Sequence, residues 1–346
     1  MNHSKYLITI ILSFYLGSVI AQETPSFEFD ASFPKPLPEG WINAQVGGVC
    51  VDSNNNITIV DRRNITEEEE ETTIPAPPIM RFNQDGDLIH SFGDPDVVPA
   101  GIHACYYDND DNIWVAGNRD SVAQKYSYEG DLLMQIGTKG VYDTSTGVRE
   151  GEPLNSSQEL LNRPSAVVTD PENGDIYISD GYGNRRVVVF DENGNYLRQW
   201  GEQSEVDYEV GEPGTFAWTV HCITMNNNGE IYVCDRYGDR VQVFNKMGEY
   251  IKSFYIGTET HSRGTAWDVE FSPDDEQTFM YVINGGWEKI EILNHETGET
   301  LSTFGRPGHQ AGAFTHAHTI AVDHDGNIYI AETSSGRRVQ RFKLVN

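Results

Sequence analysis

The chain repeats one pattern six times, and this repetition limits its fold more than any other feature. Each copy has an apolar strand, a polar turn with Asp, Asn or Gly, a second strand, a charged turn and a third strand of the VQVF kind. The clearest copy is AVVTDPENGDIYISDGYGNRRVVVFDENGNYLRQWG, residues 166–201. The other copies begin at Val49, Ala104, Cys222, Asp268 and Thr319.

Short alternating strands separated by Gly, Asn and Asp turns are typical of β-hairpins. One small sheet cannot bury both of its faces, so the copies must stack on one another, as the blades of a propeller do. The repeats therefore predict an all-β, six-bladed β-propeller. The last copy ends at Asn346 after three strands. We expect PSFEFD, residues 25–30, to add the missing outer strand and close the ring.

The N-terminus reads as an export signal. A short polar stretch precedes the apolar run YLITIILSFYLGSVIA, and Val19-Ile20-Ala21 suits a cleavage site. We therefore predict a signal peptide over residues 1–21, a propeller over residues 22–346 and secretion to the extracellular space or periplasm. No other apolar stretch approaches the roughly 20 residues of a transmembrane helix. We expect no membrane association beyond the signal.

The formal net charge is −29, from 24 basic and 53 acidic residues. Such a charge argues against nucleic acid as a partner. Among the four cysteines, Cys222 and Cys234 would face each other across one hairpin, and a disulfide or two buried thiols are both open there. Asn56, Asn64 and Asn155 begin N-x-[ST] triplets, so the protein is a glycoprotein if its source glycosylates.

Two insertions interrupt the repeat. Residues 66–78, TEEEEETTIPAPP, predict a solvated acidic loop in the first blade, with binding of a partner as the sharper alternative. Residues 141–161 predict a long polar connection between the second and third blades.

Histidine recurs at one position of the first strand in alternate copies. Counting five residues back from the turn of each copy gives Gly47, His103, Ser165, His221, Asp268 and His318. Alternate blades of a six-fold ring lie about 120° apart, so the three imidazoles would meet at one mouth of the channel. Three histidine nitrogens with an open fourth position are typical of catalytic zinc. His316 is a second group nearby, for which packing is the simpler explanation.

The turns after the second strands would lie on the same face as the histidines, because the second strand returns to that level. These turns carry Arg62, Tyr182 and Arg236. Two fixed cations could hold a carboxylate or an oxyanion, and a phenol beside zinc could act as a base. Asp180 and Asp235 end their strands, and we interpret them as turn caps or partners of nearby arginines.

The stretches SDGYGNRRVVVF, QWGEQS and VHCITMNNNGEIYVCDR resemble the peptidyl-α-hydroxyglycine α-amidating lyase family, whose core is a six-bladed propeller of NHL repeats with zinc held by three histidines. The resemblance covers nearly all of the chain after the signal. It implies that His103, His221 and His318 bind zinc, that Tyr182 is the catalytic base and that Arg62 and Arg236 bind substrate.

The implied reaction cleaves a carbinolamide into an amide and glyoxylate without net oxidation. The resemblance also implies a channel calcium, held in part by the backbone carbonyls of Val49 and Cys105 and by an aspartate directly after the third histidine. This chain has Thr319 at that position, which weakens a site for a hard cation. A separate monooxygenase would have to supply the hydroxylated substrate, and we expect a monomer.

Two other functions compete with the lyase. A non-catalytic NHL propeller that binds a protein or a glycan would need no metal, because fold does not fix function. A calcium-dependent lactonase or esterase would need a carboxylate cluster in the channel, and only Asp268 among the six aligned positions is acidic.

Overall fold

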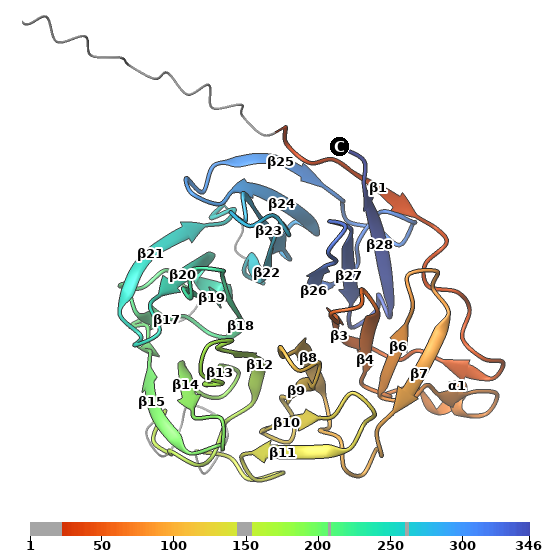
Figure 1. Ribbon diagram of the computed structural model, residues 1–346, viewed down its shortest axis with the longest axis horizontal. Coiled ribbons are helices and arrows are strands. Elements are labelled where there is room, and N and C mark those ends of the chain that lie inside the picture. The colour runs from red at the N-terminus through yellow and green to blue at the C-terminus, as the bar shows by residue number, and fades with distance from the viewer. Residues whose placement is uncertain (1–22, 144–153, 207–208, 260–262) are drawn as a thin grey trace, which may run out of the picture.

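A computed structural model describes residues 23–143, 154–206, 209–259 and 263–346. The predicted signal peptide and residues 144–153 of the connection over residues 141–161 lie outside these ranges. Six four-stranded antiparallel sheets stand around a central channel (Figure 1), which confirms the predicted six-bladed propeller. No helix in the described ranges is both long enough and apolar enough to cross a membrane.

The first three blades follow the chain from the channel outward. Blade one contains β3 (Val46–Val51), β4 (Ile57–Asp61), β6 (Ile79–Phe82) and β7 (Leu88–Phe92). Blade two contains β8 (Ile102–Tyr107), β9 (Ile113–Gly117), β10 (Val122–Tyr126) and β11 (Leu132–Ile136). Blade three contains β12 (Pro164–Thr169), β13 (Ile176–Asp180), β14 (Arg186–Phe190) and β15 (Tyr196–Trp200).

The next two blades have the same order, and the sixth closes the ring. Blade four contains β18 (Val220–Met225), β19 (Ile231–Asp235), β20 (Arg240–Phe244) and β21 (Tyr250–Tyr255). Blade five contains β22 (Ala266–Phe271), β23 (Phe279–Asn284), β24 (Lys289–Asn294) and β25 (Thr300–Phe304). Blade six contains β26 (Ala317–Val322), β27 (Ile328–Glu332), β28 (Arg338–Leu344) and the N-terminal β1 (Phe27–Asp30).

The closure by the N-terminal segment is as predicted. β1 pairs with β28 in antiparallel register from Phe27 with Leu344 to Asp30 with Arg341. The two ends of the chain thus share one sheet, which ties the ring shut.

The apolar core lies between blades, because each sheet buries both faces against its neighbours. Each of the six clusters of buried apolar residues joins two adjacent blades. Met80 of blade one, for example, shares a cluster with Tyr329 of blade six. Stability therefore depends on the completeness of the ring.

Two disulfides link strands close to the channel. Cys222 and Cys234 link β18 to β19, which decides the open question in favour of a bridge. Cys50 and Cys105 link β3 of blade one to β8 of blade two, a bridge that the sequence did not predict.

The acidic insertion is more ordered than the predicted loop. Thr66 caps a single helical turn, α1 (Glu67–Glu70), through a reciprocal capping box with Glu69. β5 (Ile74–Pro75) then pairs with β2 (Trp41–Ile42), and β16 (Glu202–Gln203) pairs with β17 (Thr215–Phe216) in the same parallel manner. The Glu69 carboxylate lies 2.6 Å from the Arg337 guanidinium, which fastens the insertion to blade six.

Candidate metal centre and functional site

The first strand of every blade breaks its pairing with the second strand at the same place. These breaks lie at Gly47, His103, Ser165, His221, Trp267 and His318, here called the ring residues, and the break at His221 also includes Cys222. A bulge redirects a side chain out of the regular alternation of a strand. The propeller thus repeats one local irregularity at the level where the histidines lie.

The predicted ring residue of blade five, Asp268, is wrong, and Trp267 takes that position. The Ser272 N–H donates to the Phe279 carbonyl, so the turn of blade five begins at Ser272 and not at Pro273. The turn is also longer than that of blade one, where the Asp52 N–H donates to the Asn56 carbonyl. Counting back from Pro273 therefore gave a position one residue too late.

The ring residues alternate between imidazoles and the carbonyls that hold them. Each histidine donates a hydrogen bond from Nδ1 to the carbonyl of the ring residue in the next blade. The distances are 2.9 Å for His103 to Ser165, 2.5 Å for His221 to Trp267 and 2.7 Å for His318 to Gly47. Because a carbonyl can only accept, Nδ1 carries the proton and Nε2 keeps its lone pair. Metal-binding histidines are commonly oriented in this way.

The three Nε2 atoms converge on one point. The side chains of His103, His221 and His318 offer ligand atoms that all lie within 4.8 Å of one another. The Nε2 atoms of His103 and His318 are 3.1 Å apart, although both are acceptors. His221 Nε2 is buried and has no hydrogen-bond partner among the described residues.

Protonation of the imidazoles does not remove the repulsion between the Nε2 lone pairs. Burial lowers the pKa of all three histidines well below the ordinary value of 6.5, and the neighbouring imidazoles and arginines lower it further. Three neutral imidazoles that present lone pairs to one buried point fit a metal cation. The residues present can therefore hold a metal ion.

Tyr182 lies directly against this point. Its hydroxyl is 2.9 Å from His103 Nε2 and lies near the Arg236 guanidinium. The pKa of Tyr182 is raised overall, because burial outweighs the charges of Arg236 and Arg62, which lower it. The backbone of this turn is fixed, because the Tyr182 N–H donates to the Arg163 carbonyl and the Trp218 indole donates to the Tyr182 carbonyl.

The two predicted arginines flank the tyrosine from opposite blades. Arg62 follows β4 and donates to the Ile102 carbonyl at 3.0 Å and to the Gln45 side chain at 3.1 Å. Arg236 opens the short helix η1 (Arg236–Gly238) and donates from Nε to the Arg263 carbonyl at 2.8 Å. The structure therefore brings the three histidines, the tyrosine and both arginines to one mouth of the channel.

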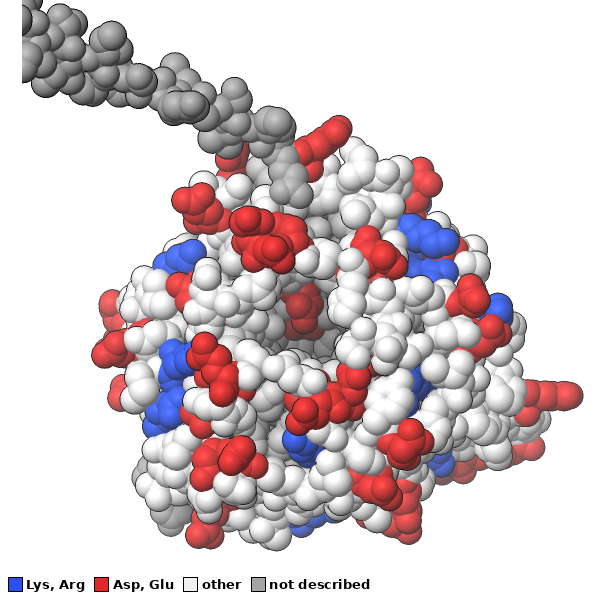
Figure 2. All heavy atoms as spheres, viewed as in Figure 1, with Lys and Arg blue, Asp and Glu red and all other residues white. Residues whose placement is uncertain are grey.

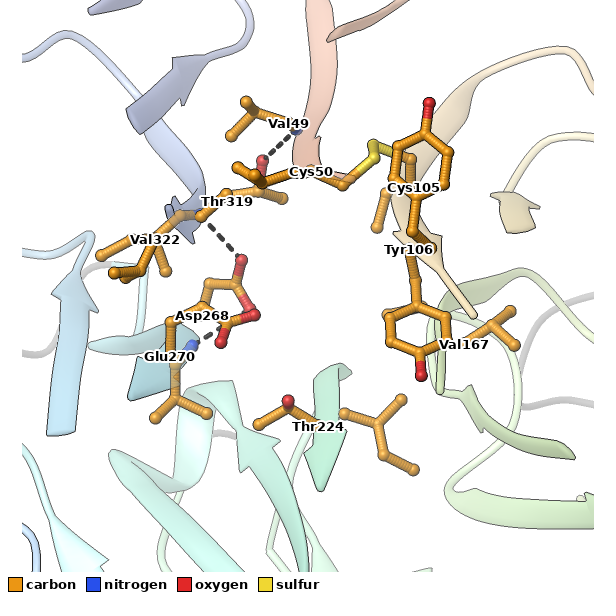
Figure 3. Close-up of a pocket in the computed structure, with 18 residues that line it drawn as sticks. Val49, Cys50, Cys105, Tyr106, Val167, Thr224, Asp268, Glu270, Thr319 and Val322 are labelled. Atoms are coloured by element: carbon orange, nitrogen blue, oxygen red, sulfur yellow. Dashed lines mark hydrogen bonds between the residues drawn. A yellow bond between two sulfur atoms is a disulfide. The ribbon is translucent and has the colours of Figure 1, made fainter. Parts of the chain in front are cut away.

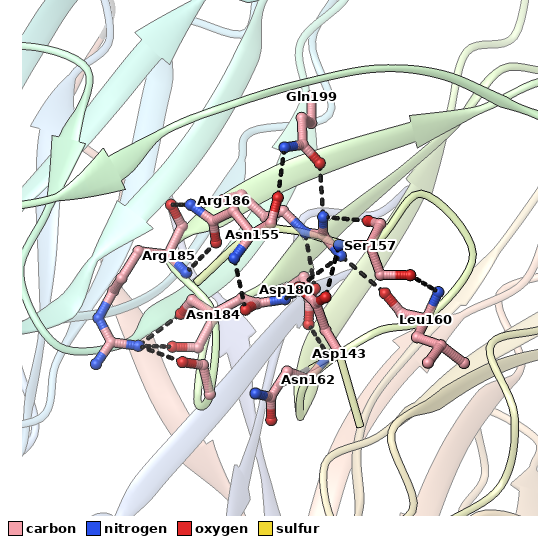
Figure 4. A network of polar contacts seen from close by, with 12 residues as sticks. Asp143, Asn155, Ser157, Leu160, Asn162, Asp180, Asn184, Arg185, Arg186 and Gln199 are labelled. Carbon is pink, nitrogen blue, oxygen red and sulfur yellow. Dashed lines mark hydrogen bonds and ion pairs between the residues drawn. The ribbon is translucent and has the colours of Figure 1, made fainter. Parts of the chain in front are cut away.

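Polar networks hold the turns that carry Tyr182 and Arg236. Asp180 accepts from the Asn162 N–H at 2.7 Å and pairs with Arg186 at 3.0 Å (Figure 4). Asp235 plays the same part beside Arg240, at 2.9 Å. Both aspartates are completely buried and occupied by these partners, in agreement with their interpretation as structural residues.

The sequence did not single out Glu288, which supports the third histidine. Its carboxylate is buried and accepts hydrogen bonds from the His316 and Ala317 N–H groups, both at 3.0 Å. Arg263 lies 3.2 Å from the same carboxylate. His316 itself is half-buried on the rim. No repeat position marks Glu288, because it lies in the turn of a neighbouring blade.

A second feature lies along the channel, on residues that follow the ring residues. It is a cavity of about 210 Å³ lined by all six first strands, and Val49 and Cys105 are among its residues. The Thr319 hydroxyl accepts from the Val49 N–H at 3.1 Å (Figure 3). Asp268 and Glu270 point into the same cavity, and Asp268 accepts from the Ile320 N–H at 2.9 Å. Acidic side chains are visible inside the central opening in Figure 2.

The two cavity carboxylates favour their protonated forms. Burial raises the pKa of Asp268 to about 7, and burial together with Asp268 raises the pKa of Glu270 to about 8. Within the described ranges, neither forms an ion pair with Lys or Arg. Thr319 supplies a hydroxyl where the resemblance calls for a carboxylate, so the carboxylates of this cavity come from blade five.

Comparison with known proteins links the repeats to named families. The NHL repeat family model matches residues 161–190 and 218–244. Peptidylglycine alpha-amidating monooxygenase of Rattus norvegicus is 26% identical over 330 residues, which cover 87% of this chain and 30% of that protein. The chain thus spans about a third of the length of that relative.

Two relatives match over nearly their whole length. The human NHL repeat-containing protein 3 is 24% identical, with 99% of this chain and 92% of that protein covered. A probable peptidyl-alpha-hydroxyglycine alpha-amidating lyase of Caenorhabditis elegans is 23% identical, with 96% of both chains covered. Among solved structures, a streptogramin B lyase has a TM-score of 0.56 at 14% identity and covers 93% of this chain and 98% of its own, a likeness of fold alone. The chain therefore carries NHL repeats and is a distant homologue of proteins named peptidyl-α-hydroxyglycine α-amidating lyase.

Proposed function

We propose that the protein is a secreted, zinc-dependent lyase that cleaves the C–N bond of a carbinolamide. The substrate would be a peptidyl-α-hydroxyglycine or a related hydroxylated compound, and the products a peptide amide and glyoxylate. The observation that carries this proposal is the Tyr182 hydroxyl, which lies 2.9 Å from His103 Nε2 and between two arginines. A base, a metal position and two cations thus share one mouth of the channel.

Zinc is the metal that we propose for the three histidines. Neutral imidazoles suit zinc, and three of them with an open position form a typical catalytic set. Zinc held by His103, His221 and His318 would act as a Lewis acid toward the hydroxyl oxygen of the substrate.

The chain's own residues account for the proton transfers. The Tyr182 phenolate removes the proton of the substrate hydroxyl, the C–N bond breaks as the aldehyde carbonyl forms, and the proton passes to the amide nitrogen. Atoms and electrons balance without an oxidant. Arg62 and Arg236 favour the phenolate by their charge and would hold the substrate carboxylate.

The direct test is the release of glyoxylate from an α-hydroxyglycyl peptide. We expect the purified protein to release glyoxylate and the peptide amide in equal amounts. Tyr182→Phe should lower the rate about 10²- to 10⁴-fold, the usual range for a lost general base, with unchanged metal content. Tyr250→Phe, on the exposed outer strand of blade four, is the matched control. Equal rates for Tyr182→Phe and the wild type would contradict the assignment.

A binding propeller is the second candidate, since NHL repeat-containing protein 3, which matches over 99% of the chain, is named for its repeats and for no reaction. Such a protein would bind a protein or a glycan on its surface and would release no glyoxylate from any α-hydroxyglycyl peptide. The same assay therefore separates the two functions.

We propose that a channel calcium, if the family's second metal is kept, takes its carboxylate from blade five. The Thr319 hydroxyl is occupied by the Val49 N–H, whereas Asp268 and Glu270 face the cavity that Val49 and Cys105 line. Carboxylate and carbonyl oxygens are the ligands that calcium prefers. Calcium should then raise the unfolding midpoint of the wild type but not that of Asp268→Asn/Glu270→Gln, and an equal response of both proteins would contradict this proposal.

We propose that the protein is exported and that another enzyme supplies its substrate. Two disulfides favour an oxidising compartment, in line with the predicted signal peptide. A separate monooxygenase would supply the hydroxylated substrate. N-terminal sequencing of protein secreted by expressing cells should find a start near Gln22, and an intact N-terminus would contradict the predicted cleavage.

A further inference from the structure

Trp267 stands out among the ring residues. The other two residues that accept a histidine Nδ1–H are Gly47 and Ser165, which are small. Trp267 needs only its backbone for that task, because its carbonyl accepts from His221. Its indole is nevertheless almost completely buried, at 3% exposure, beside the metal centre. The orientation of His221 does not account for the indole, which also packs in the apolar cluster between blades five and six.

The indole is locked in place on several sides. Its Nε1 donates to the Gly264 carbonyl at 2.8 Å. Its ring lies 5.4 Å from the His221 ring, measured between centroids. Gly285 packs flat against it, since a Cβ at Gly285 would lie 2.3 Å from an indole carbon. The ring therefore offers a rigid surface to whatever lies over it.

The Arg236 guanidinium lies over that surface. Arg236 Cζ is 4.0 Å from the centroid of the Trp267 ring and 4.8 Å from that of the Tyr237 ring. Its Nε donates to the Arg263 carbonyl, so one edge of the guanidinium is occupied. Its Nη2 donates to the Tyr237 hydroxyl at 3.4 Å, and its charge lowers the pKa of the nearby Tyr182 hydroxyl. A cation over an indole is attracted by about 0.5–2 kcal/mol, more where water is excluded.

We propose that Trp267 is a positioning residue that holds the Arg236 guanidinium in reach of both the Tyr182 hydroxyl and the carboxylate of the substrate. This role rests on the proposed lyase function. Trp267 acts through Arg236 and does not itself touch the reacting atoms. The backbone of the same residue orients His221, so one residue aligns the metal centre with the anion site.

The test is a double-mutant cycle with glyoxylate as the probe. Calorimetry would measure the affinity of the zinc-loaded protein for glyoxylate in the wild type, Trp267→Leu, Arg236→Ala and the double variant. We expect Trp267→Leu to bind glyoxylate about tenfold more weakly, a loss of the size that a cation–π contact provides, with its zinc intact. Trp267→Phe keeps a ring and should recover most of the affinity. In the Arg236→Ala background, Trp267→Leu should change nothing.

Three outcomes would overturn the role of Trp267. These are wild-type affinity in Trp267→Leu, additive losses in the double variant, and loss of zinc in Trp267→Leu, which would show a purely structural support of the metal. Trp200→Leu, a half-buried tryptophan of the outer strand β15, controls for general loosening. If Trp267→Leu does not fold, the cycle is run with Trp267→Met, whose longer side chain fills more of the space of the indole without an aromatic face.

The proposed function and this inference fail in different ways. A wild type that binds zinc and glyoxylate but releases none from an α-hydroxyglycyl peptide contradicts the lyase, and the cycle still decides the role of Trp267. With an active wild type, kcat and KM for the same variants give a second measure. We then expect Trp267→Leu to raise KM, since Arg236 binds the carboxylate, and to lower kcat by less than Tyr182→Phe does.

Discussion

At the scale of single residues, the site depends on two kinds of ring residue, which alternate around the channel. Three alternate blades give imidazoles, and the other three give the carbonyls that fix them. The histidines could be predicted from sequence because each lies five residues before a turn with Asp or Asn. Trp267 could not, since the turn of blade five carries no such landmark at the expected place.

A substitution at Gly47 tests the packing of the ring residues. A Cβ on Gly47 would lie 2.0 Å from the Ile102 carbonyl oxygen, which belongs to the backbone of the next blade and cannot rotate away. We expect Gly47→Ala to lower the free energy of unfolding by about 1–3 kcal/mol or more, as overpacking does. It should also weaken zinc binding, because the Gly47 carbonyl holds His318. Urea denaturation with metal analysis checks both, and wild-type values for both would contradict the account.

At the scale of strands and turns, the alternation of apolar and polar residues predicted most of the architecture. The insertion over residues 66–78 was predicted as a loop and instead contains α1, which Thr66 and Glu69 cap, and β5, which pairs with β2. The bridge from Cys50 to Cys105 was missed for a geometric reason. The two cysteines lie at different distances from their turns, so only the contact between neighbouring blades brings them together.

Two carboxylates on strand β22 should make the stability of the protein depend on pH. Asp268 and Glu270 have pKa values of about 7 and 8 in the folded protein, above those of the unfolded chain. The folded state therefore binds more protons than the unfolded state between about pH 4 and 8, and the free energy of unfolding falls as the pH rises through this range. In EDTA, the thermal midpoint of the wild type should fall between pH 5 and 8.5.

The variant Asp268→Asn/Glu270→Gln isolates this effect from other buried acids. Asp61, whose pKa is also raised to about 7, contributes in the same direction and stays in both proteins. The double variant should therefore show a flatter profile than the wild type. Parallel profiles would show that the two carboxylates do not govern this range.

At the scale of the whole molecule, the stability of the propeller depends on a closed ring. β1 pairs with β28, and its Phe27 ring packs against Tyr281 and Phe304 of blade five at centroid distances of 5.7 and 5.2 Å. The Asp30 carboxylate also lies 2.8 Å from Arg341 Nε. The sequence predicted this closure because the last repeat lacked one strand. It could not predict how the channel would be filled, since that depends on side chains from all blades at once.

Removal of β1 tests the closure. A chain that begins at residue 31 should unfold at a lower temperature than the chain that begins at residue 22, because blade six would lose its outer strand and Phe27 its partners. The loss should amount to at least about 2 kcal/mol, the order of burying one phenylalanine. Thermal unfolding of the two chains measures it. Equal midpoints would mean that β1 adds nothing to the ring.

The central claim is that His103, His221 and His318 bind one zinc ion, and elemental analysis of the tag-free protein tests it most directly. We predict about one zinc per chain, from the single cluster of three histidines among the described residues, and its loss in His221→Ala. His295→Ala is the matched control, since this histidine is also buried but bonds to Tyr232 outside the cluster. It should keep its zinc. A wild type without zinc, or zinc that stays in His221→Ala, would contradict the metal centre and the lyase built on it.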